Sequence, residues 1–113
     1  MNLTTDRSHG LPIVRVKEER LIYPLLSDFA NAVVALIEGG DRRVIVDLST
    51  VGYVDSATIG CLMDLYRQAT AVGGAIKLAG VQKRVETMLT MTGAQNFIEV
   101  HADEQSAVKS FGG

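Results

Sequence analysis

Residues 44–48, with the sequence VIVDL, limit the possible folds of this chain more than any other segment. The run is almost wholly apolar and is shorter than an ordinary helix, so it is typical of a strand that is covered on both faces. Strands of this kind occur in sheets that carry helices on both sides. We therefore expect an α/β protein in which residues 44–48 form the central strand.

Strand-like and helix-like segments alternate along the rest of the chain. Apolar residues recur every three or four positions after Pro24 and after Ser56, and glycine pairs end both patterns. Single helices between strands favour a parallel sheet with right-handed crossovers. We predict a small, mainly parallel or mixed sheet of four to five strands covered by about four helices. The predicted strands are residues 11–17, 44–48, 75–79 and 97–100, and the predicted helices are 24–39, 55–72, 81–92 and 103–111.

The domain organisation follows from length and composition. A chain of 113 residues with 47% hydrophobic and 5% aromatic residues suits one close-packed domain. We place this domain at residues 11–111. Residues 1–10 have little to bury, so we expect them to be a flexible tail or a short edge element.

Composition also makes several classes of function improbable. The net charge of -2 argues against nucleic-acid binding, and neither a signal peptide nor a membrane-spanning run is present, so we expect a cytoplasmic protein. Cys61 is the one cysteine, and a zinc site would need the distant His9 or His101. We expect no metal, no cofactor and no disulfide, and we interpret Cys61 as a half-buried packing residue.

Asp55 and Ser56 are the most informative polar pair. They follow the central strand at the edge of the sheet where α/β proteins form sites, and they begin the next helix. Ser56 would lie where backbone N–H groups and the positive end of the helix dipole can stabilise a phosphate. The simpler interpretation is a helix N-cap worth about 1 kcal/mol. Spacing alone leaves both interpretations open.

The stretch DLSTVGYVDSATIG at residues 47–60 resembles the signature of STAS-domain anti-sigma factor antagonists, also called anti-anti-sigma factors. It has a strand ending in Asp-Leu, a short loop, an apolar-Asp-Ser sequence and a glycine-containing helix start. Residues 73–100, GGAIKLAGVQKRVETMLTMTGAQNFIEV, resemble the same family. The resemblance covers roughly residues 11–111 and implies the STAS-like fold.

This resemblance implies a bacterial partner switch that regulates transcription. The unmodified protein would bind an anti-sigma factor that is also a GHKL-type serine kinase, and phosphorylation of Ser56 would end the interaction. A metal-dependent serine phosphatase would reset the protein, which is a substrate and no enzyme. The implied partner surface comprises Asp55, Ser56, Ala57, Thr58, Gly60 and Asp64. We expect a monomer or weak dimer.

The chain departs from the common family pattern at two places. Thr58 stands where a glycine is frequent, and residues 18–23 replace a frequent Gly-x-apolar-Asp turn. We expect the Thr58 hydroxyl to act inside the first helical turn rather than to replace Ser56. The altered turn puts the identity of the partner in question.

Two other functions remain as alternatives. A structural STAS module could hold a larger signalling assembly or lipid-transport complex together without being phosphorylated. A small enzyme or ligand carrier would need a pocket for which this core leaves little room. A Ser-His-Asp triad with His101 is improbable because the chain has no G-x-S-x-G elbow. Met63, Met88 and Met91 have helical spacing and are expected to fill the core.

Overall fold

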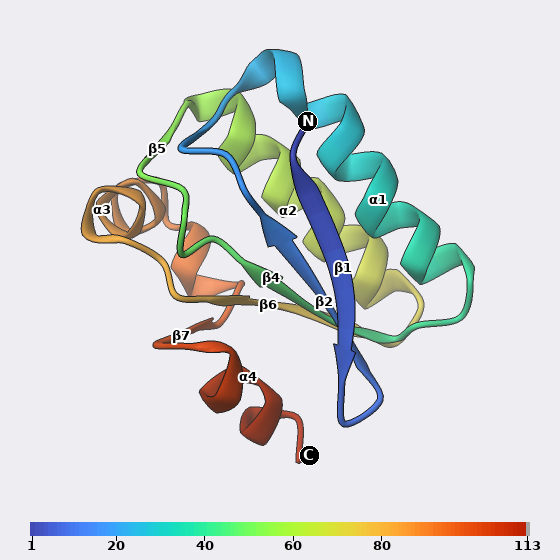
Figure 1. Ribbon diagram of the computed structural model, residues 1–113. Helices are drawn as coiled ribbons and strands as arrows, with labels where there is room; N and C mark the ends of the chain where they lie inside the picture. Colours follow the sequence, from blue (N-terminus) through green and yellow to red (C-terminus); the bar gives the residue numbers. More distant parts are fainter. Residues whose placement is uncertain (113) are drawn as a thin grey trace.

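The computed structural model describes residues 1–112 and contains a five-stranded mixed sheet with helices on both faces (Figure 1). The strand order is β1-β2-β4-β6-β7. The strands are β1 (Leu3–Ser8), β2 (Leu11–Val16), β4 (Arg43–Asp47), β6 (Ala75–Ala79) and β7 (Val100–His101). β1 pairs antiparallel with β2, and the other neighbouring pairs are parallel. The α/β class and the central position of residues 44–48 are confirmed.

The helices divide unequally between the two faces. α1 (Leu26–Glu38), α2 (Ser56–Ala71) and α3 (Lys83–Thr92) pack on one face around a core that includes Phe29, Leu62 and Leu89. α4 (Glu104–Ser110) alone covers a small second cluster on the other face, where Ile13 and Ile45 are buried. The core beneath the three helices is therefore much the larger.

Helix boundaries agree with the start and stop signals in the sequence. A short 3-10 turn, η1 (Tyr23–Leu25), carries Pro24 and leads into α1. α3 ends at Gly93, whose φ of 79° is the left-handed conformation that glycine adopts most easily. A second 3-10 turn, η2 (Ala94–Asn96), follows.

Three parts of the fold differ from the prediction. Residues 3–8 form the edge strand β1. Of the two alternatives for residues 1–10, the structure has the short edge element and not the flexible tail. The strand expected at residues 97–100 is β7, shorter and displaced toward the C-terminus, and Phe97 is 58% exposed. Met91 is 77% exposed, so its predicted core role is wrong. Met91 follows Met88 by three residues, which suggested a shared face. The buried face of α3 is formed by Val85 and Leu89, and Met91 lies outside it.

A small two-stranded sheet was not predicted at all. β3 (Arg20–Leu21) pairs in parallel with β5 (Tyr53–Val54). Two residues per strand are too few to show an alternating pattern. This pairing holds residues 18–23 beside the start of α2, and it therefore builds one side of the candidate site.

Candidate functional site at the start of helix α2

Asp55 is the N-cap of α2 and ties two backbone segments together. Its Oδ1 accepts a hydrogen bond from the Thr58 N–H at 2.9 Å, and its Oδ2 accepts one from the Tyr23 N–H at 3.0 Å. The carboxylate thus fixes the start of α2 and links it to η1. The predicted role of Asp55 at the helix start agrees with this geometry.

The pKa of Asp55 reflects this position. Burial raises the pKa of the carboxyl group, but the hydrogen bonds from Tyr23 and Thr58 favour the charged form and bring the net pKa below its usual value. Asp55 is therefore ionised at neutral pH. A fixed negative charge stands directly beside Ser56.

Thr58 lies inside the molecule, with no exposed surface. Its Oγ1 is 2.6 Å from the carbonyl oxygen of Leu21 and 2.8 Å from Asp55 Oδ1, and its single proton can serve one acceptor at a time. This arrangement agrees with the expected role inside the first helical turn. It also removes Thr58 from the predicted partner surface, because a buried side chain cannot touch a docking protein.

Ser56 is the first residue of α2 and is exposed. Within residues 1–112, its hydroxyl makes no hydrogen bond to another residue, so the side chain takes no part in holding the helix. The N–H groups of Ser56 and Ala57 precede the first intrahelical bonds of α2, and Thr58 N–H is already capped. Ser56 therefore presents an available hydroxyl beside unused backbone donors.

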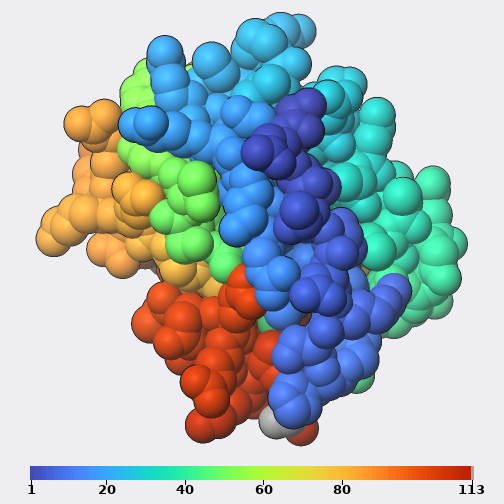
Figure 2. Space-filling view, viewed as in Figure 1, coloured from blue at the N-terminus to red at the C-terminus, as the bar shows by residue number. Residues whose placement is uncertain are grey.

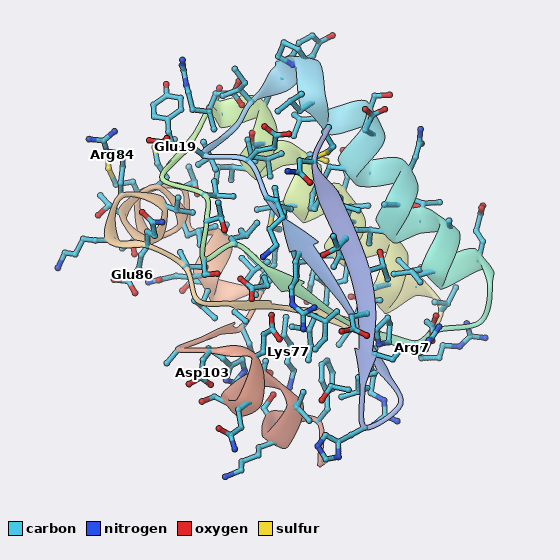
Figure 3. The ribbon with its side chains drawn as sticks, viewed as in Figure 1. Arg7, Glu19, Lys77, Arg84, Glu86 and Asp103 are labelled. Carbon is cyan, nitrogen blue, oxygen red and sulfur yellow. The ribbon has the colours of Figure 1, made fainter. Side chains whose placement is uncertain are left out.

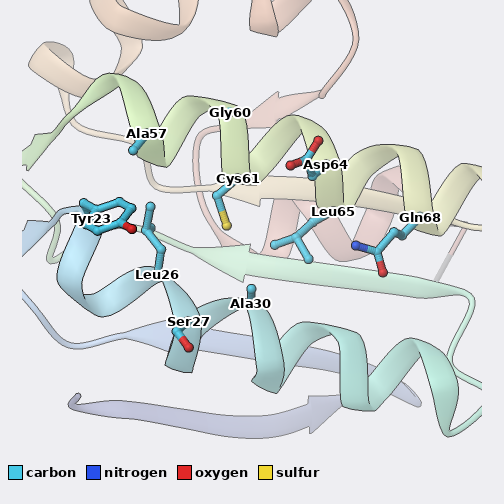
Figure 4. A pocket seen from close by; sticks show the side chains of 10 residues that line it. All are labelled: Tyr23, Leu26, Ser27, Ala30, Ala57, Gly60, Cys61, Asp64, Leu65 and Gln68. Carbon is cyan, nitrogen blue, oxygen red and sulfur yellow. The ribbon is translucent and has the colours of Figure 1, made fainter.

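A shallow groove of about 430 Å³ runs between α1 and α2 and begins at Ala57, the residue after Ser56 (Figure 4). Ala57, Gly60 and Asp64 form its α2 side, together with Cys61, Leu65 and Gln68. Tyr23 lies at one end and is 73% exposed. The structure thus brings five of the six predicted site residues to one exposed region, with Asp55 at its inner edge.

Gly60 has a distinctive position in this groove. It occupies the interior of α2, where glycine costs about 1 kcal/mol relative to alanine. A Cβ added there would meet nothing within 4 Å, so packing inside the domain does not require glycine. The missing side chain leaves the backbone of α2 open to close approach from outside.

The β3–β5 pair adds residues that sequence reasoning missed. Tyr53 is 38% exposed, and the Arg20 guanidinium lies 5.0 Å from the centre of its ring. Tyr23 and Tyr53 therefore flank the segment that leads into Ser56. The departure from the family pattern at residues 18–23 was the one sequence signal that pointed to this part of the surface.

The remaining candidates have structural explanations. Burial raises the pKa of the Cys61 thiol and nearby Asp64 raises it further, which disfavours the reactive thiolate. His101 Nε2 lies 3.1 Å from Glu99 Oε1 at the far end of β7 and belongs to no triad with Ser56.

Residues 1–112 hold no cluster of metal-binding side chains. Across the same residues, every helix is too short or too polar to cross a bilayer.

Comparison with known proteins agrees with this geometry. A model of the STAS domain matches residues 2–107. The anti-sigma-B factor antagonist of Bacillus subtilis is 26% identical over 72 residues, a segment that spans 64% of this chain and 64% of that protein. The aligned segment thus covers just under two thirds of that relative.

Solved structures extend the likeness to nearly the whole chain. An anti-sigma-factor antagonist (STAS) domain protein from Planctomyces limnophilus superposes with a TM-score of 0.88 at 16% identity, over 98% of each chain. The phosphorylated form of SpoIIAA, a cell fate determinant of Bacillus, gives a TM-score of 0.74 at 14% identity, over 97% of this chain and 99% of that one.

The mixed sheet, its helices and the capped start of α2 define a small α/β domain of the STAS class. The chain belongs to the STAS domain family, whose model matches almost its full length. Within that family, its sequence relatives include anti-sigma factor antagonists.

Proposed function

We propose that this chain is an anti-sigma factor antagonist of a bacterial partner-switching pathway. Unmodified, it binds an anti-sigma factor that is also a GHKL-type serine kinase, and phosphorylation of Ser56 releases it. The observation that carries this proposal is the exposed Ser56 hydroxyl at the first position of α2, which makes no bond that holds the fold. A residue so placed can be modified without unfolding the domain.

The surroundings of Ser56 suit both states of such a switch. Ala57 and Gly60 are small, so a partner can come close to the α2 backbone in the unmodified state. A phosphate would add up to two negative charges beside the ionised Asp55, and the unused N–H groups at the helix start would favour it there. Docking would then be opposed by charge and bulk, while the helix would tolerate the modification.

The same proposal assigns the other components of the pathway. A metal-dependent serine phosphatase restores Ser56, and the chain itself is a substrate rather than an enzyme. The partner surface consists of Asp55, Ser56, Ala57, Gly60 and Asp64, without Thr58. We place the protein in the cytoplasm, where the kinase and its ATP are found, with transcription as the output.

The first experiment is mass spectrometry of the protein isolated from its own cells. We expect one phosphate on the peptide that contains Ser56. The second incubates the purified protein with a cognate GHKL-type kinase and ATP. Ser56→Ala should abolish labelling, whereas Ser27→Ala, on the opposite side of the groove, should label normally. Equal labelling of Ser56→Ala would contradict the proposal.

A structural STAS module is the competing function, and binding separates the two. In the proposed switch, Ser56→Asp weakens binding to the kinase strongly and Ser56→Ala retains it. Partner binding that is unchanged by Ser56→Asp, together with no phosphate on the isolated protein, would favour the structural module.

A further inference from the structure

Within residues 1–112, strand β1 leaves one edge of the sheet without a partner strand. It is the first strand in the order β1-β2-β4-β6-β7, and residues 4–7 are exposed. Figure 2 shows β1 (dark blue) running down the surface with no other segment lying over it. An open strand edge of six residues without proline is a template for pairing with another strand.

The pairing of β1 with β2 determines which backbone groups face outward. The Lys17 N–H donates to the Asn2 carbonyl at 2.8 Å, so Asn2 and Lys17 form a hydrogen-bonded pair of the antiparallel ladder. Such pairs alternate with pairs that make no mutual bonds. The register therefore turns the N–H and C=O groups of Thr4 and Asp6 toward β2, and those of Leu3, Thr5 and Arg7 outward.

The two charged side chains of β1 are held by their own molecule. Arg7 forms two hydrogen bonds with Asp41, at 3.0 and 2.9 Å, and Figure 3 shows Arg7 beside the hairpin. Asp6 Oδ2 lies 3.3 Å from Arg15 Nη1, and Asp6 Oδ1 accepts the Arg7 N–H at 2.8 Å. An unpaired charge on an edge strand is a usual protection against pairing with another strand. Neither Asp6 nor Arg7 provides one, because each is already bonded within its own molecule.

We propose that β1 pairs antiparallel with β1 of a second copy of this chain, about a two-fold axis at Thr5, so that the two sheets join into one. This inference rests on β1 alone and does not depend on the proposed function.

The occupant follows from the symmetry of the outward groups. With Thr5 opposite Thr5 of the second copy, Leu3 lies opposite Arg7, so all three outward residues of each strand meet outward residues of the other. Thr4 then faces Asp6, and no like charges stand opposite each other. A register centred on Arg7 would instead oppose two arginines. In this register the two β1 strands can form four backbone hydrogen bonds directly. Two more can form when the Asp6 carboxylate of each copy releases the Arg7 N–H.

Oligomeric state provides the test. Light scattering coupled to size-exclusion chromatography, together with sedimentation, should show a concentration-dependent dimer of the wild-type chain. Thr5→Pro removes an outward N–H but leaves the β1–β2 ladder intact, and it should weaken dimerisation at least about tenfold. Thr5→Val keeps the N–H and the preference for strands, and should dimerise like wild type.

Three further variants make the test independent of any folding defect. Thr5→Lys sets two positive charges against each other at the axis, and its dimerisation should be weak and partly restored by salt. In a Cys61→Ala background, Thr5→Cys should form an intermolecular disulfide readily, whereas Thr4→Cys should not. A chain that stays monomeric at high concentration, or a dimer that Thr5→Pro and Thr5→Lys leave unchanged, would overturn the proposal.

Discussion

Thr58 donates a hydrogen bond to the carbonyl oxygen of Leu21 at 2.6 Å, within the buried contact between α2 and β3. These two residues lie in the two segments where the chain departs from the common family pattern. The two departures are therefore in contact. The Thr58 hydroxyl, at a position where glycine is frequent, donates to the Leu21 carbonyl in the altered turn at residues 18–23. This bond helps to fix the surface beside Ser56.

We predict that Thr58→Val lowers the free energy of unfolding by about 1–2 kcal/mol, because the buried Leu21 carbonyl loses its hydroxyl partner while the volume is preserved. Denaturant unfolding measures the change. Thr87→Val is the matched control, since Thr87 is exposed on α3 and its Oγ1 bonds the Lys83 carbonyl of its own helix. Equal effects at the two sites would show that the Leu21 bond has no special value.

Asp55→Ala should cost about 1–2 kcal/mol of unfolding free energy, since it removes the cap of α2 and the bond to Tyr23. Asp64→Ala, at an exposed position further along α2, should change stability by less than about 0.5 kcal/mol. Comparable losses would argue against the capping role.

The contribution of Asp55 should depend on pH. Its pKa is lowered in the folded protein, so its stabilising effect is complete above the unfolded-state value of about 3.9. The effect is lost as the pH falls from that value through the lower folded pKa. The stability gap between wild type and Asp55→Ala should therefore be constant near neutrality and shrink in acid. A gap unchanged at pH 2 would contradict this prediction.

Gly60→Ala should raise stability by about 0.5–1 kcal/mol, because the added Cβ meets nothing and alanine favours helix. It should at the same time weaken binding to the proposed kinase. Gly74→Ala provides the contrast, since its Cβ would overlap the Arg42 carbonyl oxygen and destabilise the fold. Unchanged kinase binding by Gly60→Ala would exclude the α2 groove from the interface.

Glu104→Ala should loosen α4 more than the rest of the domain. Glu104 accepts two hydrogen bonds from Arg15, at 2.7 and 2.9 Å, and these anchor the first turn of α4 to β2. We expect a loss of about 1–2 kcal/mol and faster hydrogen exchange in α4 than in α2. Glu86→Ala, at an exposed acid in the first turn of α3, is the control.

Sequence reasoning succeeded where one local signal determines one element. The apolar run at residues 44–48 predicted the central strand, and the order Asp55, Ser56 before an amphipathic pattern predicted the start of α2. Both signals are short-range and agree with the tertiary structure. The five site residues other than Thr58 were found together for the same reason, since they belong to the N-cap and the first turns of one helix.

Prediction from the sequence failed where tertiary contacts determine the conformation. Residues 4–8 are polar, and only the hairpin through His9 and Gly10, both at positive φ, brings them against β2. Thr58 was included in the partner surface that the resemblance implied, yet its side chain turns inward to Leu21. The role of Tyr53 depends on β3–β5 pairing, which two-residue strands cannot signal.

The division of labour between Asp55 and Ser56 has a consequence for how this site can vary. Asp55 uses both carboxylate oxygens to hold the helix start, while the neighbouring hydroxyl holds nothing. The residue that holds the fold, Asp55, and the residue proposed to be modified, Ser56, are thus direct neighbours in the chain. Substitutions at Ser56 should change the proposed partner surface at little cost in folding, whereas any change at Asp55 alters both that surface and the start of the helix.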